Sequence, residues 1–424
     1  MISLSQKSSH VFFQNQVIKK FTKLFFKKKK QENAYYCFTK NINMATTQLQ
    51  YINKHVQQND LDIAFRKLID FVRDTEDMSS FQKIIDLTDW KESTHFSEKI
   101  FKIRFGQLLQ ELNGFDYVAS AAKRKLMLEV TDIGKTYRRN NFSLGPINLT
   151  LKKGEIIGLV GENGNGKTTL LTILAQELSF DKGNLAYFFD DQPKDTFGLR
   201  TKLAYVPQRP NKWYGSLQDN LKFVLANYKI PPEEIDLRVL LVIARLGLWR
   251  YKDLNWNELS SGYKMRFELA RTLLRKPEIL LLDEPLANLD IMAQQIILED
   301  LKLISTSPKN PIALILSSQQ LYEIEKISDK VIFLQEGIMH NTEEKLEEEE
   351  QVVIELDTQA SKEKLEQIFQ DLSLENISFN GGVFVLYFKT GTQQADILLS
   401  LATHKITLLN FRDISHSSRR YFDN

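Results

Sequence analysis

The sequence predicts a mixed α/β protein built from a helical segment, an α/β core with a parallel sheet, and a small α+β domain. Residues 44–125 carry apolar residues at helical spacing. Strand and helix patterns alternate from residue 127 to about residue 333, and a glycine-rich loop joins one of these strands to a helix. Residues 352–424 show the order β-α-β-β-α-β. These observations predict domains at 44–125, 127–342 and 352–424.

The composition limits the classes of protein that are compatible with the chain. Its 424 residues, 42% of them hydrophobic, suffice for about two to four domains. The formal net charge of +2 gives no reason to expect a nucleic-acid partner. A single cysteine, Cys37, fits a reducing compartment. No run of about 18 apolar residues occurs, so any membrane role is expected to depend on a separate membrane-spanning partner.

Residues 1–43 differ from the rest, because lysine dominates them and Glu32 is their only acidic residue. A short amphipathic helix here would suit the surface of anionic lipid. The apolar residues that would share its face are Val17, Ile18, Phe21, Leu24 and Phe25. The alternative is a disordered extension, or upstream sequence absent from a protein that begins at Met44. Both interpretations stay open.

Residues 44–125 are predicted to form a small helical module. Two apolar stripes at helical spacing support this prediction: Leu61, Phe65, Leu68 and Val72, and then Ile100, Ile103, Leu108 and Leu112. Gly114 stands where a helix is expected to end, and the basic residues 123–125 suit a linker. The module either binds a partner or covers one flank of the core, and its residues indicate no specific ligand.

The core begins at about residue 127, where strand patterns replace the helical ones. Residues 128–133 and 154–160 are predicted strands. The continuous apolar run 279–282 is typical of a strand buried on both faces of a parallel sheet. The acidic run 343–350 predicts a solvated linker or a frayed helix after the core.

The last domain is predicted to be ferredoxin-like, because its six elements follow the order of that fold. A strand at 352–356 precedes a helix at 362–372, for which Ser361 is the expected N-cap. A hairpin of 377–379 and 383–388 turns at Gly381 and Gly382. A helix at 395–402 and a strand at 406–411 complete the series.

A loop with the sequence GENGNGKTT, residues 161–169, fits the phosphate-loop pattern G-x-x-x-x-G-K-[ST]. Its glycines let backbone N–H groups surround a polyphosphate, and the helix that follows adds the positive end of its dipole. Lys167 can neutralise the β- and γ-phosphates, and the Thr168 hydroxyl can bind Mg²⁺. The predicted phosphate-binding residues are Gly161, Glu162, Asn163, Gly164, Asn165, Gly166, Lys167, Thr168 and Thr169.

Two carboxylates, Asp283 and Glu284, end the apolar strand in the segment ILLLDEP, residues 279–285. Residues in this position lie at the carboxyl edge of a parallel sheet, where α/β proteins hold ligands. Transfer of a phosphoryl group to water needs one carboxylate for Mg²⁺ and another that orients or deprotonates the water. We assign Asp283 to the metal ion and Glu284 to the water.

The ordered set of motifs resembles the ABC ATPase family over roughly residues 128–337. LSSGY at 259–263 stands where the family's LSGGQ signature belongs, and LANLD at 286–290 matches its D-loop. The resemblance implies that Gln208 contacts Mg²⁺ and that Tyr137 stacks on the adenine of ATP. Tyr137 would equally suit a half-buried position on a strand.

The resemblance also implies a dimer. In this family the signature of one subunit caps the γ-phosphate bound by the other, which implies nucleotide contacts for Ser260, Ser261, Gly262 and Tyr263. One chain carries one phosphate loop and one signature. A complete site is therefore expected to need a second ABC ATPase domain, in a head-to-tail homodimer that holds two ATP molecules with Mg²⁺.

Three residues depart from the family pattern. Ser261 and Tyr263 replace a glycine and the glutamine of the signature, and Gln319 stands where the switch histidine is expected. A glutamine amide can donate a hydrogen bond to the γ-phosphate but cannot carry a positive charge. We expect hydrolysis to survive with an altered rate or pH dependence. The predicted catalytic residues are Glu284, Lys167 and Gln319, and the predicted metal ligands are Thr168, Gln208 and Asp283.

Two functions compete at this point. The first is the ATP-hydrolysing subunit of a transporter, held at the cytoplasmic face of a membrane by a separate permease. The second is a soluble ABC ATPase that acts on a ribosome, nucleic acid or protein complex. A single ATPase domain and the short segment 209–258 favour the transporter. Residues 352–424 resemble the accessory domain of ATPases paired with ABC-2-type exporters, and SSRRYF at 417–422 resembles a motif at their ends, which favours export.

Overall fold

The computed structural model describes residues 44–113, 115, 125–137, 142–228, 230–341, 351–380 and 382–415. The chain divides into two compact units, Met1–Ala119 and Ser120–Asn424. Several predictions concern residues outside the described ranges: the basic extension 1–43, the helix end at Gly114, residues 123–124 of the linker, the acidic run 343–350, Gly381 and the segment 417–422.

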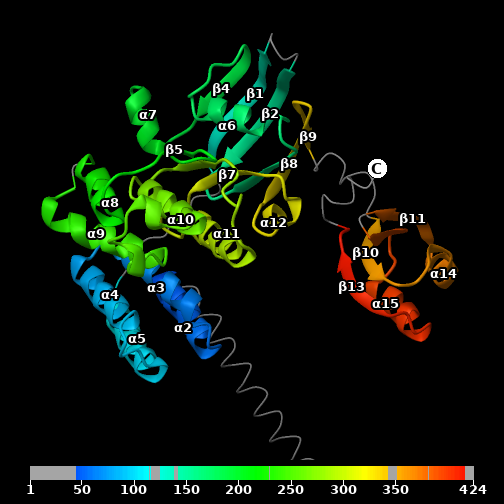
Figure 1. Ribbon diagram of the computed structural model, residues 1–424, viewed down its shortest axis with the longest axis horizontal. Helices are drawn as coiled ribbons and strands as arrows, with labels where there is room; N and C mark the ends of the chain where they lie inside the picture. Colours follow the sequence, from blue (N-terminus) through cyan, green and yellow to red (C-terminus); the bar gives the residue numbers. More distant parts are fainter. Residues whose placement is uncertain are drawn as a thin grey trace, which may run out of the picture. The chain divides into compact units, whose positions relative to one another are not determined.

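The described part of the first unit is helical, as predicted (Figure 1). Its helices are α2 (Met44–Gln57), α3 (Leu61–Thr75), α4 (Met78–Lys91) and α5 (Glu98–Leu112). The first predicted stripe is confirmed, because Phe65, Leu68 and Val72 on α3 are buried. Asp77 caps α4: its carboxylate accepts the backbone N–H of Ser80 at 2.8 Å and the Ser80 hydroxyl at 2.6 Å. The hydrogen bond from the Ser80 hydroxyl lowers the pKa of Asp77.

The second predicted stripe is wrong in its first half. Ile100 and Ile103 are 45% and 54% exposed, whereas Phe101 and Phe105 on the same helix are buried. The Phe101 ring lies 5.7 Å from the Phe65 ring of α3, so the aromatic side chains form the inner face of α5. Helix α5 carries two apolar stripes, and the larger aromatic rings remove more surface from water than isoleucine does. Leu108 and Leu112 are buried as predicted.

The second unit contains a six-stranded sheet in the order β5-β6-β7-β3-β8-β9. The first five strands in this order pair in parallel, which confirms the predicted parallel sheet. The sixth strand, β9, pairs with β8 in the antiparallel direction. The strands are β3 (Ile156–Val160), β5 (Leu203–Val206), β6 (Ile279–Leu282), β7 (Ala313–Ser318), β8 (Lys330–Gln335) and β9 (Ile338–Asn341). All four residues of β6 are buried, as predicted for a central strand.

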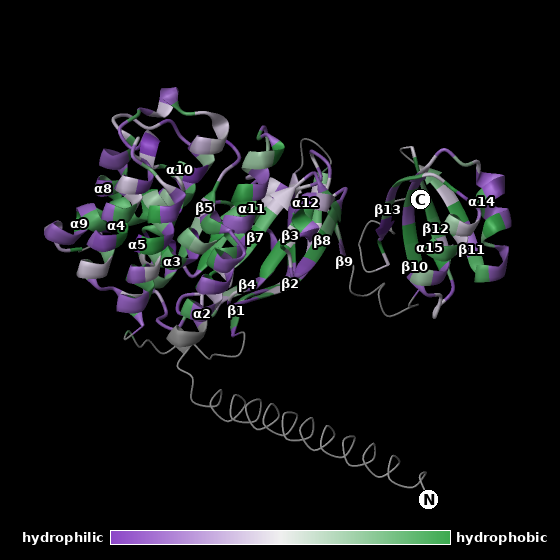
Figure 2. Ribbon diagram, turned by 90° about the horizontal axis from the view of Figure 1, so that it is seen from below, coloured by the Kyte–Doolittle hydropathy of each residue, from purple (hydrophilic) through white to green (hydrophobic). Residues whose placement is uncertain are grey.

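A second, antiparallel sheet of three strands has the order β2-β1-β4. Its strands are β1 (Leu126–Tyr137), β2 (Phe142–Lys152) and β4 (Lys182–Tyr187). Apolar side chains of both sheets pack with helix α6 (Lys167–Leu174) in one core, to which Leu170 and Leu171 contribute. Figure 2 shows apolar residues concentrated along the central strands of this unit.

Further helices lie between the strands along the chain. They are α7 (Thr196–Lys202), α8 (Leu217–Ala226), α9 (Pro232–Arg245), α10 (Ser261–Leu273), α11 (Ile291–Ser305) and α12 (Leu321–Glu325). Gly158 in β3 permits close packing of α12, since a Cβ atom there would lie 2.0 Å from the Cγ2 atom of Ile324. Among the described residues, no helix combines the length and apolar character that are needed to cross a membrane.

The last domain has the predicted element order, and its antiparallel sheet has the strand order β11-β12-β10-β13. This order agrees with a ferredoxin-like fold. Its elements are β10 (Val352–Thr358), α14 (Lys362–Ile368), β11 (Leu374–Asn380), β12 (Val383–Phe388), α15 (Gln394–Thr403) and β13 (Leu408–Asp413). The Ser361 hydroxyl accepts the backbone N–H of Lys364, so Ser361 is the N-cap as predicted.

Candidate functional site

The loop of residues 161–169 joins β3 to α6, as the sequence predicted. Gly164 and Gly166 have φ angles of +87° and +97°, in the left-handed region that favours glycine. A Cβ atom on Gly161 would lie 2.3 Å from the carbonyl oxygen of Leu334. Side chains larger than hydrogen are therefore excluded or strained at these positions, and the loop backbone can approach a ligand at the N-terminus of α6.

Lys167 lies inside this loop, with only 4% of its surface exposed. Its Nζ atom donates to the carbonyl oxygens of Gly161 and Glu162 at 2.7 and 3.1 Å. The same atom lies 3.3 Å from Oε1 of Glu284, a carboxylate that is 8% exposed. The phosphate loop and the end of β6 thus meet through a buried ion pair.

Asp283 follows β6 and is held by hydroxyl groups from two other elements. The Thr168 hydroxyl on α6 donates to Oδ2 of Asp283 at 2.8 Å, and the Ser317 hydroxyl on β7 donates to Oδ1 at 2.8 Å. The Ser317 oxygen also accepts the backbone N–H of Glu284 at 2.8 Å. Burial, and then the charge of Asp283, raise the pKa of the neighbouring Tyr205.

Two glutamine amides contact the carboxylate of Glu284. Nε2 of Gln208 donates to Oε2 at 2.8 Å. Nε2 of Gln319 lies 3.1 Å from Oε1 and 3.0 Å from Oε2. Glu284 itself has a φ angle of +47°, a conformation that costs energy for a residue other than glycine and that clusters at functional sites. Together with Lys167, the two amides fix the position of this carboxylate.

The signature residues lie at the start of α10. Ser260 is the N-cap of this helix, and the Ser261 hydroxyl donates to the carbonyl oxygen of Asn288 at 2.9 Å. The Tyr263 ring lies 3.8 Å from the Tyr251 ring, and the Tyr251 hydroxyl donates to that of Tyr263 at 2.8 Å. This hydrogen bond raises the pKa of Tyr263.

Gly262 lies against α11, since a Cβ atom added to it would be 3.3 Å from the Cβ atom of Ala293. Within the described ranges, no hydrogen bond or ion pair joins residues 260–263 to the phosphate loop or to the two carboxylates. The structure therefore groups the signature with the D-loop segment 286–290 rather than with the phosphate loop of the same chain.

The remaining predicted residues lie around the loop. Tyr137 ends β1 half-buried, opposite Phe142 of β2, and the two ring centroids are 6.3 Å apart. Asn165 accepts the backbone N–H of Glu336 through its side chain at 3.1 Å. Asn163 is exposed, and Thr169 is half-buried on α6.

Sequence reasoning missed Ser317. Its hydroxyl touches both neighbouring carboxylate residues, and its side chain is fully buried. The only signal in the sequence was a serine at the carboxyl end of an apolar strand, in the segment LSSQQ at 316–320. Without the order of the strands, nothing indicated that β7 lies directly beside β6.

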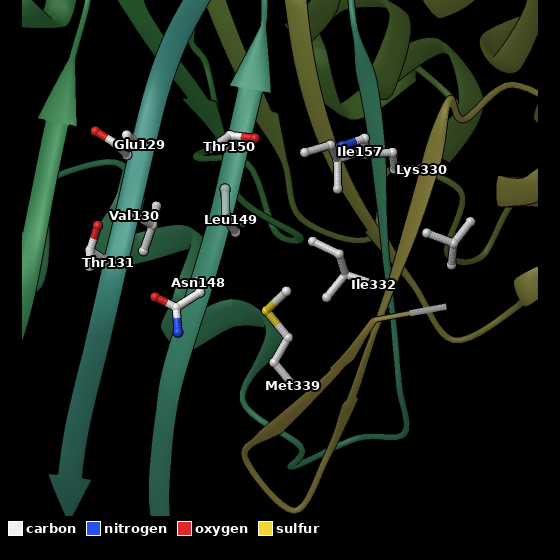
Figure 3. A pocket seen from close by; sticks show the side chains of 11 residues that line it. Glu129, Val130, Thr131, Asn148, Leu149, Thr150, Ile157, Lys330, Ile332 and Met339 are labelled. Atoms are coloured by element: carbon white, nitrogen blue, oxygen red, sulfur yellow. The ribbon is translucent and has the colours of Figure 1, made fainter. Parts of the chain in front are cut away.

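A separate concavity of about 270 Å³ lies between the antiparallel sheet and strands β3, β8 and β9 (Figure 3). Its lining includes Ile157 and Lys330, at the amino ends of β3 and β8. The phosphate loop follows the carboxyl end of β3, at the opposite edge of the sheet. No predicted site residue lines this concavity, so the chemical groups described above belong to the phosphate-loop edge alone.

A nucleotide-binding P-loop domain is the class that this fold and cluster define. The family model described as ABC transporter matches residues 144–287. The energy-coupling factor transporter ATP-binding protein EcfA1 of Caldanaerobacter subterraneus is 34% identical over 199 residues, which cover 46% of this chain and 70% of the relative. The chain belongs to the family of ABC transporter ATP-binding proteins.

The match covers a smaller share of the PotA proteins. The spermidine/putrescine import ATP-binding protein PotA of Borrelia garinii is 34% identical over 215 residues, or 50% of this chain and 61% of that protein. The chain thus spans about three fifths of the length of the PotA proteins it matches. Among solved structures, the chain is similar to cbiO1 from Clostridium perfringens, part of the ABC transporter complex cbiONQ. The superposition covers 58% of this chain and 96% of the cbiO1 chain, with 27% sequence identity and a TM-score of 0.47.

Proposed function

We propose that this protein binds and hydrolyses ATP and thereby powers an ABC transporter through a separate membrane-spanning partner. The observation that carries the proposal is the meeting of Lys167, Thr168, Asp283 and Glu284 at one edge of the parallel sheet. Phosphoryl transfer to water requires a phosphate loop, a hydroxyl and a carboxylate that bind a metal ion, and a second carboxylate that orients the water.

In this proposal the loop 161–169 and Lys167 hold the β- and γ-phosphates of ATP. The backbone N–H groups and the positive end of the α6 dipole face the bound anion. Glu284 orients and deprotonates the attacking water, because its carboxylate lies beside the lysine that neutralises the phosphate. The amides of Gln208 and Gln319 keep the carboxylate oxygens in place.

The side chains fit a Mg²⁺ ion of the kind that accompanies ATP. The Thr168 hydroxyl and the Asp283 carboxylate share a hydrogen bond of 2.8 Å, so these two oxygens are neighbours. Gln208 contacts Glu284, the residue that follows Asp283. Mg²⁺ would neutralise charge that develops on the phosphate oxygens. No group of three or more His, Cys, Asp or Glu side chains suited to a metal gathers among the described residues.

The grouping of the signature with the D-loop segment supports a head-to-tail dimer of two copies. Ser260 offers a hydroxyl, and Gly262 offers a backbone N–H at the N-terminus of α10. Neither residue contacts the phosphate loop of its own chain among the described contacts. In the proposed dimer they meet the γ-phosphate held by the second copy, where a helix N-terminus favours an anion.

The membrane partner belongs to the same proposal, as does a place at the cytoplasmic face of the membrane. PotA and EcfA1 are named as ATP-binding proteins of transport systems, which supports coupling to transport. The name of PotA specifies import. Export remains a prediction that rests on the ferredoxin-like C-terminal domain, and nucleic acid is not an expected partner.

The test is a pull-down of the Glu284→Gln protein from detergent-solubilised membranes with ATP and Mg²⁺. Loss of the base should stop hydrolysis and hold the closed dimer on its partner. The matched control also carries Lys167→Ala, which should prevent ATP binding and release the partner. ATP-dependent recovery of a polytopic membrane protein in comparable amount supports the proposal. Recovery of ribosomes, nucleic acid or only soluble proteins contradicts it and favours a soluble ABC ATPase.

A further inference from the structure

Asp181, the residue before β4, makes contacts that have no role in the chemistry described above. Its Oδ2 atom accepts the backbone N–H of Thr136 at 2.9 Å. Nζ of Lys135 donates to its Oδ1 atom at 3.2 Å. The backbone N–H of Asp181 donates to the carbonyl oxygen of Gly134 at 2.8 Å. One residue thus contacts three consecutive residues near the end of β1.

The end of β1 extends beyond its pairing with one of its two neighbours. Strand β1 lies between β2 and β4 (Figure 1). Its pairing with β4 ends at Gly134, whereas its pairing with β2 continues to Tyr137. A backbone N–H group beyond the last strand pair needs another acceptor. The Asp181 carboxylate supplies this acceptor for Thr136 and so supports β1 up to the residue before Tyr137.

Close packing of the start of β4 against β1 keeps the Asp181 carboxylate in this position. Gly183 has a φ angle of +95°, and a Cβ atom added to it would lie 2.4 Å from the carbonyl oxygen of Asp132. The side chains of Lys135 and Asp181 are 15% and 45% exposed. An ion pair at the surface contributes little net energy. The hydrogen bond to the Thr136 backbone is therefore the contact that fixes the strand end.

Tyr137 lies on the side of β1 that faces the phosphate loop. Paired residues of adjacent antiparallel strands place their side chains on the same face, so Tyr137 shares a face with Phe142. The two ring centroids are 6.3 Å apart. Phe142 packs on the loop, because a Cβ atom added to Gly166 would lie 3.0 Å from Cζ of Phe142. A half-buried aromatic ring thus lies beside the loop, where the base of a bound nucleotide can stack on it.

We propose that Asp181 is a positioning residue that holds the end of β1 so that Tyr137 stacks on the base of the bound nucleotide. It acts through the backbone of Thr136, the neighbour of Tyr137. Stacking depends on the separation and tilt of the two rings, so a strand end held on both sides favours the contact. The inference rests on the proposed function, because it names a determinant of nucleotide affinity at the same site.

The test compares equilibrium binding of ATP with that of tripolyphosphate, which offers phosphates without a base, to the full chain. Tyr137→Ala should weaken ATP binding about tenfold, the usual order of effect for losing one base stack. Asp181→Ala should weaken it about fivefold, while tripolyphosphate affinity and kcat stay within about twofold. The double variant should bind ATP no more weakly than Tyr137→Ala, because Asp181 acts through that ring.

Two further variants separate the hydrogen bond from the ion pair. Asp181→Asn keeps a side-chain oxygen that can accept the Thr136 N–H, so it should restore most of the ATP affinity that Asp181→Ala loses. Lys135→Ala removes the ion pair and leaves that hydrogen bond in place. Its ATP affinity should stay within about twofold of the wild-type value. Thermal unfolding establishes that each variant is folded.

Asp190→Ala is the matched control. Asp190 follows β4 as Asp181 precedes it, and it also joins this strand to its neighbours. Its carboxylate accepts from Nζ of Lys125 at 2.6 Å and from Nζ of Lys153 at 3.4 Å. Lys125 precedes β1, so these contacts lie at the opposite end of that strand from Tyr137. Asp190→Ala should leave the affinities for ATP and tripolyphosphate unchanged.

The outcomes separate this inference from the proposed function. A wild-type protein that binds ATP no more tightly than Asp181→Ala overturns the inference alone. So does an equal loss of ATP and tripolyphosphate affinity, or an effect of Asp181→Ala that persists in full when Tyr137 is replaced. A folded wild-type protein that binds neither ligand overturns the proposed function, and the inference falls with it. A loss confined to ATP, absent from Asp190→Ala and restored by Asp181→Asn, supports the positioning role.

Discussion

The amide of Gln319 and the carboxylate of Glu284 are hydrogen-bonded, with Nε2 of Gln319 3.0 Å from Oε2 and 3.1 Å from Oε1. The two residues lie just beyond β7 and β6, which are neighbours in the parallel sheet. A glutamine amide can donate to a carboxylate but cannot change its charge with pH. In this protein, a group that does not titrate therefore contacts Glu284, at the position where the resemblance to the family predicts a histidine.

We expect Gln319→His to add a dependence on pH that the wild-type protein lacks. Histidine titrates near pH 6.5, so kcat of the variant should change between about pH 5.5 and 7.5. Gln319→Ala should lower kcat about tenfold, because Glu284 loses one of its donors. The measurement is a pH profile of ATP hydrolysis for each protein.

Gln320→Ala is the matched control, since the neighbouring Gln320 contacts Ser318 through its backbone N–H and its side chain is exposed. The Glu284→Gln protein defines the background rate. Wild-type turnover no higher than this background, with any partner present, would contradict the prediction that hydrolysis survives without the histidine.

Ser317→Ala should weaken both the fold and the use of Mg²⁺. The substitution leaves the buried backbone N–H of Glu284 without its acceptor and removes a donor from Asp283. We expect a loss of about 1–3 kcal/mol in the free energy of unfolding, measured by urea denaturation. The Mg²⁺ concentration for half-maximal hydrolysis should rise. Ser318→Ala, one residue along β7, should leave the Mg²⁺ dependence unchanged, and equal effects of the two substitutions would argue against this role.

Asp77 should stabilise the helical module in a pH-dependent way. The pKa of Asp77 is lower in the folded protein, because its carboxylate accepts from Ser80. A lowered pKa means that the stabilisation is complete above the unfolded value, about 3.9, and is lost as the pH falls through the folded value.

Asp77→Ala should therefore reduce the stability of the module by about 1 kcal/mol at pH 7, the usual effect of losing an N-cap. The difference from the wild-type protein should become smaller at a pH below the folded value, because the protonated carboxyl group is a weaker acceptor. Denaturation curves at several pH values, followed by circular dichroism, measure it. A difference that does not change with pH would show that the charge of Asp77 plays no part.

Removal of residues 44–125 should leave the affinity for ATP nearly intact. All the site contacts described above, including that of Tyr137 with Phe142, come from residues beyond 125. Equilibrium binding of ATP to the full chain and to the shortened chain measures the effect. A large loss of affinity would mean that the helical module supports the site.

The sequence alone was sufficient for the parts of this protein whose chemistry is local. A phosphate loop depends on glycines at positive φ and on a lysine in the first turn of a helix, and all of these lie within residues 161–169. The buried strand β6 and its two terminal carboxylates form one short segment as well. The order of the six elements in the last domain was also readable, because each element has its own periodicity.

Tertiary structure decided which distant residues meet. Gln208 and Glu284 are 76 positions apart, and they touch because β5 and β6 are adjacent in the sheet. Ser317 reaches both carboxylates only because β7 lies on the other side of β6. On α5, the choice between two apolar stripes depended on which side chains fill the space beside α3. Periodicity shows that a helix has an apolar face, but packing selects the face that is buried, because only the neighbouring helix defines the shape to be filled.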